Sequence, residues 1–249
     1  MVFAYDNNIE DYTITGTSYS EVYSVNNIQD KKLTKIFKGT NSDNNQRIVI
    51  DAGVSIIPEL FAILGHNFTT ETISIEANSS DVWGAPAFSY QFTEIKDIMY
   101  YQYSGVAYRY WSIYIENCDI PYNPPEIGLV YMGDIVEFTD PSVITPSNVD
   151  DNTVFEKSAD NTLYAYKGET IRQNFQLGFN NNIFNADFII LKSIFSEVGK
   201  AYPFIIIWDT TEDFAAVPNI YCNFMTGITI EEMAGYEVSS ISFTVEECK

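Results

Sequence analysis

The sequence predicts a mainly β protein, in which an antiparallel sandwich is followed by a small β domain that carries one α-helix. The prediction rests on three observations. Many short runs alternate apolar and polar residues, and clusters of Asn, Asp, Ser and Gly separate these runs. Aromatic residues make up 15% of the 249 residues, with 18 Tyr and 17 Phe. Aromatic side chains fit half-buried pleated surfaces, so this composition favours sheets.

The alternating runs are clearest in the first half of the chain. They are "RIVIDAG" (47–53), "ETISIEAN" (71–78), "YRYWSIYIEN" (108–117) and "GLVYMGDIVEF" (128–138). Because successive side chains of a strand point to opposite faces, each run has one apolar face. If two such layers face each other, their apolar residues must be buried, among them Ile48, Ile50, Ile73 and Trp111.

A change of pattern near residue 140 divides the chain. The segment "DPSVITPSNVDD" (140–151) holds two prolines and has no strong periodicity, which is typical of a linker. We therefore predict a sandwich domain over 1–140, a linker over 141–152 and a small β domain over 153–249.

One segment of the second half has helical rather than alternating periodicity. Its apolar residues recur at spacings of three and four, which predicts an amphipathic helix over about 186–199 that ends near Gly199. These residues are Phe188, Leu191, Ile194, Phe195 and Val198. The last run, "YEVSSISFTVEE" (236–247), alternates with one out-of-phase step at Ser239–Ser240, which indicates a β-bulge.

The charge excludes several classes of partner. The formal net charge is −21, from 34 acidic against 13 basic residues. Phosphate binding needs clustered cations, so we expect no nucleic-acid binding.

No run approaches 18 apolar residues, so we expect no membrane insertion. The first residues are acidic where a signal peptide is cationic, and we expect the chain to fold in a cytoplasm.

Enzyme chemistry has little support in the sequence. The only histidine is His66, in "AILGHNF" (62–68), and no nucleophile motif, P-loop or dinucleotide fingerprint is present. We interpret His66 and Asn67 as groups that satisfy loop backbone atoms. The three cysteines have no metal-ligand spacing, which indicates free thiols and no metal site. Because the catalytic motifs are absent, we expect no catalytic residues. The oxygen-rich loops 6–11 and 147–151 leave room for a structural calcium ion, although we favour plain solvated loops.

Taken in order, the motifs resemble a known family. "RIVIDAG" (47–53), "AILGHNF" (62–68), "YRYWSIYI" (108–115) and "EIGLVYMGD" (126–134) follow one another as in the discoidin-like, galactose-binding-like jelly roll of phage tail and other virion proteins. The helix followed by "YPFIIIWD" (202–209) and the closing alternating strand is similar to the last domain of phage minor tail proteins. The resemblance covers a little over half of the chain.

The resemblance implies a non-enzymatic structural protein of a virion, assembled in the host cytoplasm. It would build the tail tip or baseplate or attach fibres, and its partners would be other tail proteins and copies of itself. The alternative is a carbohydrate- or receptor-binding adhesin that recognises a host-surface glycan through loop aromatics. The candidate residues for glycan stacking, or for packing against a neighbouring subunit, are Trp83, Phe88, Tyr100, Tyr101 and Tyr103.

Overall fold

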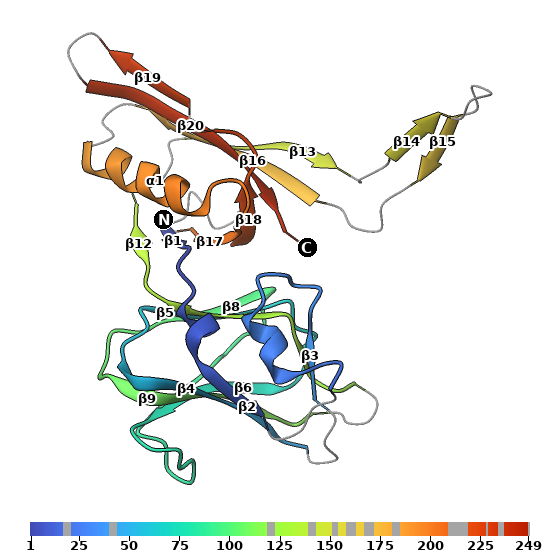
Figure 1. Ribbon diagram of the computed structural model, residues 1–249, viewed down its shortest axis with the longest axis vertical. Coiled ribbons are helices and arrows are strands. Elements are labelled where there is room, and N and C mark those ends of the chain that lie inside the picture. Colours follow the sequence, from blue (N-terminus) through green and yellow to red (C-terminus); the bar gives the residue numbers. More distant parts are fainter. Residues whose placement is uncertain are drawn as a thin grey trace. The chain divides into compact units, whose positions relative to one another are not determined.

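The computed structural model divides the chain into two compact units. It describes residues 1–16, 21–39, 44–118, 123–138, 143–150, 154–157, 163–166, 172–180, 185–208, 219–227, 229–233 and 237–248. Residues 6–135 form one unit, here called the sandwich unit, and residues 1–5 with 136–249 form the other, here called the helix unit (Figure 1). The predicted mainly β fold with antiparallel sheets and one helix is confirmed.

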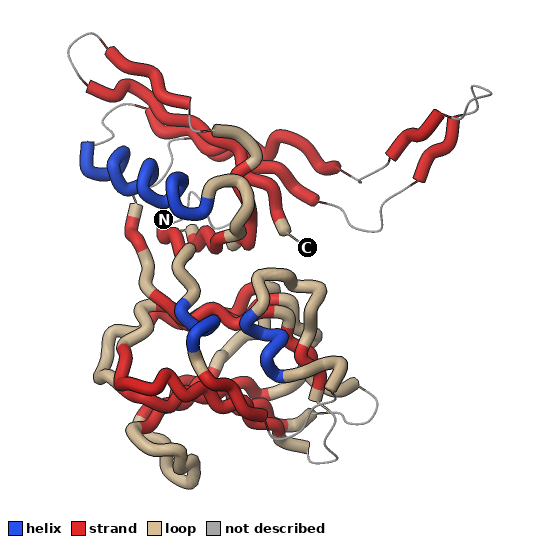
Figure 2. The backbone as a smooth tube through the Cα atoms, in the orientation of Figure 1, coloured by secondary structure: helices blue, strands red, loops and turns tan. Residues whose placement is uncertain are grey.

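The sandwich unit consists of two antiparallel sheets packed face to face (Figure 2). The five-stranded sheet has the order β2 (Thr13–Gly16), β4 (Gln46–Ile56), β9 (Tyr108–Glu116), β6 (Thr72–Asn78) and β7 (Phe88–Gln91). The three-stranded sheet has the order β11 (Leu129–Gly133), β5 (Leu60–Leu64) and β8 (Ile98–Gln102). A short pair joins β3 (Phe37–Lys38) and β10 (Glu126–Ile127). Strands β7 and β8 are thus each an edge strand, and β2 and β11 form the other edges of the two sheets.

The core of this unit is formed by the apolar strand faces that the sequence predicts. Ile48, Ile50, Ile73 and Trp111 are each at most 1% exposed, as predicted. The layers meet where the Phe61 ring of the smaller sheet lies 6.3 Å from the Trp111 ring of the larger one. On β9 the Arg109 guanidinium also makes a bidentate contact with the Asp51 carboxylate of β4, with N···O distances of 2.7 and 2.8 Å.

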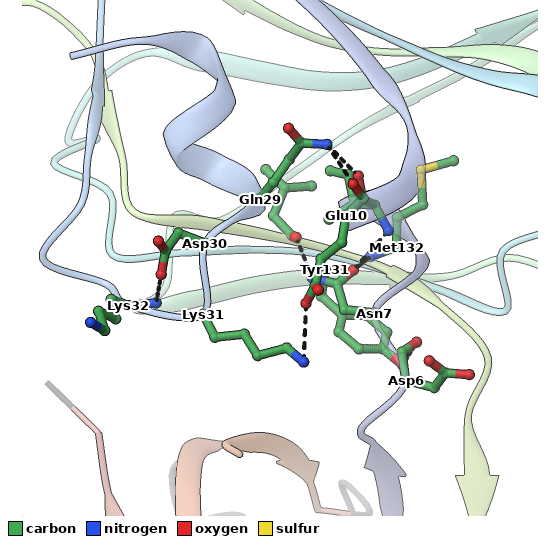
Figure 3. A network of polar contacts seen from close by, with 11 residues as sticks. Asp6, Asn7, Glu10, Gln29, Asp30, Lys31, Lys32, Tyr131 and Met132 are labelled. Carbon is green, nitrogen blue, oxygen red and sulfur yellow. Dashed lines mark hydrogen bonds and ion pairs between the residues drawn. The ribbon is translucent and has the colours of Figure 1, made fainter. Parts of the chain in front are cut away.

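A polar network fastens the first residues of the sandwich unit to β11 (Figure 3). The 3-10 helix η1 (Asn8–Asp11) is capped by Asn7, whose amide donates to Val130 O and accepts from Met132 N, both at 2.9 Å. The second 3-10 helix, η2 (Val25–Gln29), ends on Gln29, whose side chain donates to the carbonyls of Ile9 and Tyr12. Buried backbone groups therefore find partners where the chain enters this unit.

The helix unit has an eight-stranded antiparallel sheet and one helix. The strands along its main path are β12 (Val136–Glu137), β1 (Val2–Ala4), β17 (Phe204–Ile207), β18 (Ile220–Phe224), β20 (Glu237–Glu247), β16 (Arg172–Asn180) and β13 (Val143–Asp150), and β19 (Thr229–Met233) pairs with β20. A separate hairpin joins β14 (Val154–Lys157) and β15 (Leu163–Tyr166).

The helix α1 (Asn185–Val198) agrees with the predicted helix to within one residue at each end. Its residues Leu191, Ile194 and Val198 are buried in one cluster with the rings of the sheet. Gly199 follows with a φ of +53°, a conformation that favours glycine at a helix end. The register between β19 and β20 skips Ser239, so the predicted bulge is present.

The structure differs from the predicted domain boundaries in two places. Residues 1–5 do not belong to the sandwich unit, because β1 pairs with β17 and β12 of the helix unit. Residues 143–150, predicted as part of a linker, form strand β13, paired with β16 along its length. Pro146 misled the prediction, because it lies on an edge strand, beside a register shift, where no N–H is needed. Residues 141–142 and 151–152 of the predicted linker lie outside the described residues.

Candidate functional site

The edge strands β7 and β8 and the loop between them line a groove. The groove has a volume of about 380 Å³, within the range of small-ligand sites. We call it the edge groove. Its lining residues are Tyr90, Phe92, Thr93, Glu94, Lys96, Ile98, Met99, Tyr100, Tyr101 and Gln102. All of them belong to the sandwich unit.

Two tyrosines that line the edge groove stack on each other. The rings of Tyr90 on β7 and Tyr101 on β8 stack with their centroids 3.9 Å apart and an interplanar angle of 25°. The Phe92 ring meets Tyr90 edge-on at 5.2 Å. Tyr101 also packs against the core of the sandwich. This stack therefore joins the two edge strands, which share no backbone ladder.

Tyr100 occupies the opposite face of β8. It pairs with Ala62 of β5, while its neighbours Met99 and Tyr101 are directed to the core. The Tyr100 side chain is half-buried, and within the described part of the chain no aromatic ring stacks on it. Gln102, two residues further on the same face, is exposed. Tyr100 thus offers a ring and a hydroxyl to the groove, beside an amide.

The loop 92–97 supplies the charged groups of the edge groove. Lys96 Nζ lies 3.0 Å from Glu94 Oε2, and both side chains are largely exposed, at 65% and 69%. The hydrogen bond with Glu94 raises the pKa of Lys96. The only cation that lines the groove is therefore already paired with a carboxylate.

His66 fixes this loop to the body of the sandwich unit. Its Nδ1 lies 3.3 Å from the backbone N–H of Phe68, which makes Nδ1 an acceptor and places the ring proton on Nε2. Nε2 then donates to the carbonyl of Lys96 at 2.8 Å. The ring stacks on Phe68 at 4.6 Å. Burial lowers the pKa of His66 below its usual value.

The predicted structural role of "AILGHNF" is confirmed for both polar residues. Besides the contacts of His66, the Asn67 amide donates to Asn123 Oδ1 and to the carbonyl of Pro124, and it accepts from Glu126 N–H. Each of these distances is 2.9 to 3.0 Å. His66 has a further role, because it also anchors a loop that lines the edge groove.

The structure separates the five aromatic residues that the sequence grouped together. Tyr100 and Tyr101 line the edge groove. Tyr103 is 6% exposed, its hydroxyl donates to Val106 O at 2.7 Å, and the Phe88 ring meets it edge-on at 4.8 Å. Phe88 and Tyr103 therefore belong to the core, because the inward face of their strands leads there.

Trp83 lies on another face of the sandwich unit. Its ring covers the Arg47 guanidinium at 4.9 Å, and the ring of Tyr114 contacts the same guanidinium at 4.2 Å. Arg47 also forms an ion pair with Glu76 and donates to Ser112 at 2.6 Å. The ring of Trp83 thus shields a partly buried charge on the outer face of the five-stranded sheet.

Sequence reasoning missed most of the residues that line the edge groove. Tyr90, Phe92, Glu94 and Lys96 were not among the predicted site residues. A signal was present: "FSYQF" (88–92) and "MYYQY" (99–103) both place rings at every second position. Such runs predict neighbouring strands with aromatic faces, but they do not reveal that both strands are edges.

The cysteines and the predicted calcium loops show no ligand site in the described residues. No disulfide joins Cys118, Cys222 and Cys248. Burial raises the pKa of Cys118 to about 11 and that of Cys222 well above its usual value. Within the described ranges no group of three or more His, Cys, Asp or Glu residues is placed to hold a metal ion. Residue 151 of the second predicted loop lies outside the described residues.

Comparison with known proteins finds similarity only among solved structures. No protein-family model matches the sequence, and no curated protein matches it. A chitosan-binding module of a chitosanase/glucanase from Paenibacillus sp. IK-5 is 16% identical, with a TM-score of 0.41, over 52% of this chain and 99% of that one. A fucose-binding module of Streptococcus pneumoniae is 10% identical, with a TM-score of 0.43, over 52% of this chain and 98% of that one.

The lectin domain of lectinolysin, in complex with Lewis B antigen, is also 10% identical, with a TM-score of 0.42. That similarity covers 51% of this chain and 95% of the lectin domain. No comparison bears on the phage-tail part of the resemblance, which stays a prediction. In the part of the chain that the structure describes, no helix is long and apolar enough to cross a membrane.

Proposed function

We propose that the sandwich unit binds a neutral glycan in the edge groove. The observation that carries the proposal is the position of Tyr100, a half-buried ring at the groove beside the exposed side chains of Gln102 and Thr93. Sugar sites combine an aromatic platform with a few hydrogen-bonding groups. The stacked rings of Tyr90 and Tyr101 line the same groove.

The charges of the edge groove favour a sugar without acidic groups. Lys96 is paired with Glu94, and the chain as a whole carries −21 formal charges. A carboxylated or sulfated glycan would be repelled by this field and would have to break the Lys96–Glu94 pair. A neutral sugar needs only the ring of Tyr100 and the polar groups around it.

A glycan array probed with the full chain tests the proposal. We expect signals from neutral glycans and none from sialylated or sulfated ones. A neutral glycan identified on the array is then titrated in solution by calorimetry. Tyr100→Ala should weaken its binding by about tenfold, which is the effect expected from the loss of one aromatic contact. Tyr23→Ala is the matched control, because Tyr23 is an exposed ring that does not line the groove. Equal losses in both variants would contradict a site at the groove.

A second candidate function is assembly of repeated copies, as the resemblance to phage tail proteins implies. The hairpin β14–β15 favours it. This hairpin is a two-stranded sheet of four residues per strand, to which no third described strand is added. A two-stranded ribbon alone is marginally stable in water, whereas a ribbon that adds to a sheet of another chain is stabilised.

Light scattering tests the assembly function. Replacing residues 154–166 by a short Gly-Ser linker should abolish any concentration-dependent oligomer, while the glycan-array signal is retained. An oligomer that persists in this variant would show that the hairpin does not mediate assembly, and a chain that stays monomeric at high concentration would contradict the function itself.

A further inference from the structure

The single histidine bridges two segments that must hold together for the edge groove to keep its shape. One ring nitrogen of His66 accepts from Phe68 N–H, and the other donates to the Lys96 carbonyl. The first contact holds the ring to the segment that leads into β6. The second holds the loop that carries Glu94 and Lys96 into the groove. At its start the loop is also held by the Phe92 N–H, which donates to the Ile73 carbonyl at 3.0 Å. His66 holds the part of the loop that carries Lys96.

Only a neutral imidazole can make both contacts. In the imidazolium both nitrogens carry a proton, so Nδ1–H would point at the N–H of Phe68 at 3.3 Å. The ring is rigid and planar. It therefore cannot turn away from Phe68 without moving Nε2 away from the Lys96 carbonyl and disturbing the stack on Phe68.

The charged groups around His66 do not remove this sensitivity. The hydrogen bond with the Lys96 carbonyl favours the imidazolium, as do Asp97 and Glu71, but the effect of burial is larger, so the pKa of His66 is lowered overall. The contact that protonation breaks directly is therefore the one with Phe68 N–H. Glu71 already accepts from the backbone N–H groups of Thr69 and Thr70, at 2.6 and 2.9 Å. The ammonium of Lys96 is paired with Glu94. No carboxylate is hydrogen-bonded to the His66 ring among the described residues.

We propose that His66 is a proton-sensitive latch on the loop 92–97, and that acidification releases this loop and opens the edge groove. Ligand release is the part of this inference that rests on the proposed function. The latch itself is a property of the protein alone. Each lost hydrogen bond is worth about two- to tenfold in the population of the closed loop, and glycan affinity should fall with it below pH 6.5.

Nuclear magnetic resonance can test the latch directly, because the chain has one histidine and its ring signals need no assignment. We expect the neutral form with the proton on Nε2 at pH 7.5, and a midpoint of titration below the usual 6.5. On acidification the loop amides should lose protection from hydrogen exchange, after correction for the intrinsic pH dependence. A proton on Nδ1, or an ordinary free-histidine titration, would overturn the latch.

The variant His66→Gln separates the latch from a merely structural role. A Gln amide can accept from Phe68 and donate to Lys96, yet it does not titrate between pH 5 and pH 8. Loop protection in this variant should be as high as in the wild type at pH 7.5 and should not change on acidification. Asp97→Asn is the control for titration of the nearby carboxylate and should keep the acid response.

The outcomes distinguish failure of the latch from failure of the proposed function. If the loop responds to acid only when His66 is present, the latch stands even when no glycan binds at any pH. If a neutral glycan binds with the same affinity at pH 7.5 and 5.0 and the loop amides of wild type and His66→Gln behave alike, the latch is refuted and the glycan site stands.

Discussion

The two units bury their aromatic rings in different ways. In the sandwich unit Trp111 is surrounded by Phe61, Tyr103 and Tyr108, and the chain of rings continues through Phe88 and Tyr101 to the sheet edges. The helix unit has a cluster of phenylalanines under α1. It includes Phe3, Phe138, Phe204, Phe224 and Phe243.

This difference bears on function, because tyrosine has a polar end and phenylalanine has none. A row of tyrosines can begin in a core and end at water, where the hydroxyl remains hydrated. A cluster of phenylalanines has to be closed, here by the apolar side of α1. The proposed glycan site accordingly lies in the unit whose row of rings includes tyrosines.

The units also differ in where their strands come from. All strands of the sandwich unit lie within residues 6–135, whereas the helix unit needs β1 from the start of the chain. The first residue of the chain donates to Phe138 O at 3.2 Å. The helix unit therefore needs residues 1–5 as well as residues 136–249 to complete its sheet.

The largest expected effect is on the core of the sandwich unit. Trp111→Ala removes a fully buried indole that contacts both sheets, so the free energy of unfolding should fall by about 3–5 kcal/mol. In calorimetry only the transition of the sandwich unit should move. Trp83→Ala, which removes a half-buried indole, is the control and should cost less. A shift of both transitions would show that the units unfold as one.

The next effect concerns the N-terminal strand. Phe3→Ala removes a fully buried ring that lies 5.8 Å from both Phe138 and Phe204. We expect the helix unit to lose about 3–4 kcal/mol and the sandwich unit to be unchanged. Limited proteolysis followed by mass spectrometry would locate the change. New cleavage sites within 6–135 would contradict the division of the chain.

A smaller effect is expected on the outer face of the five-stranded sheet. Arg47→Met leaves the Glu76 carboxylate without its partner in a site where the two side chains are 17% and 10% exposed. The cost should be about 2–3 kcal/mol, since a carboxylate in a partly buried site loses its compensating charge. The double variant Arg47→Met, Glu76→Leu should recover most of it in urea denaturation. A double variant as unstable as the single one would assign the loss to packing of Trp83.

The last prediction concerns the reactivity of the cysteine thiols and not the free energy of unfolding. With a pKa of about 11, Cys118 is about one part in a thousand thiolate at pH 8. Native alkylation should therefore spare Cys118 and the fully buried Cys222, while the half-buried Cys248 reacts. Peptide mapping would check this. Rapid labelling of Cys118 in the native protein would contradict this prediction, because it would show that the sandwich unit often opens and exposes this buried thiol to solvent.

Local patterns predicted much of this structure because they depend on neighbours in sequence. The buried faces of β4 and β9, the extent of α1 and the bulge at Ser239 all follow from periodicities of two or about 3.6 residues. The edge groove did not follow, since it depends on which strands are left unpaired.

Composition and the spacing of apolar residues were enough to predict a mainly β protein, the apolar face of each strand and the position of the helix. They did not predict that Val2–Ala4 completes the sheet of the helix unit, or that Tyr90 meets Tyr101 at two sheet edges. The two kinds of feature differ in the range of the interactions that set them. Alternation is set by backbone geometry within a few residues, whereas the pairing of strands depends on contacts between segments that are far apart in the chain.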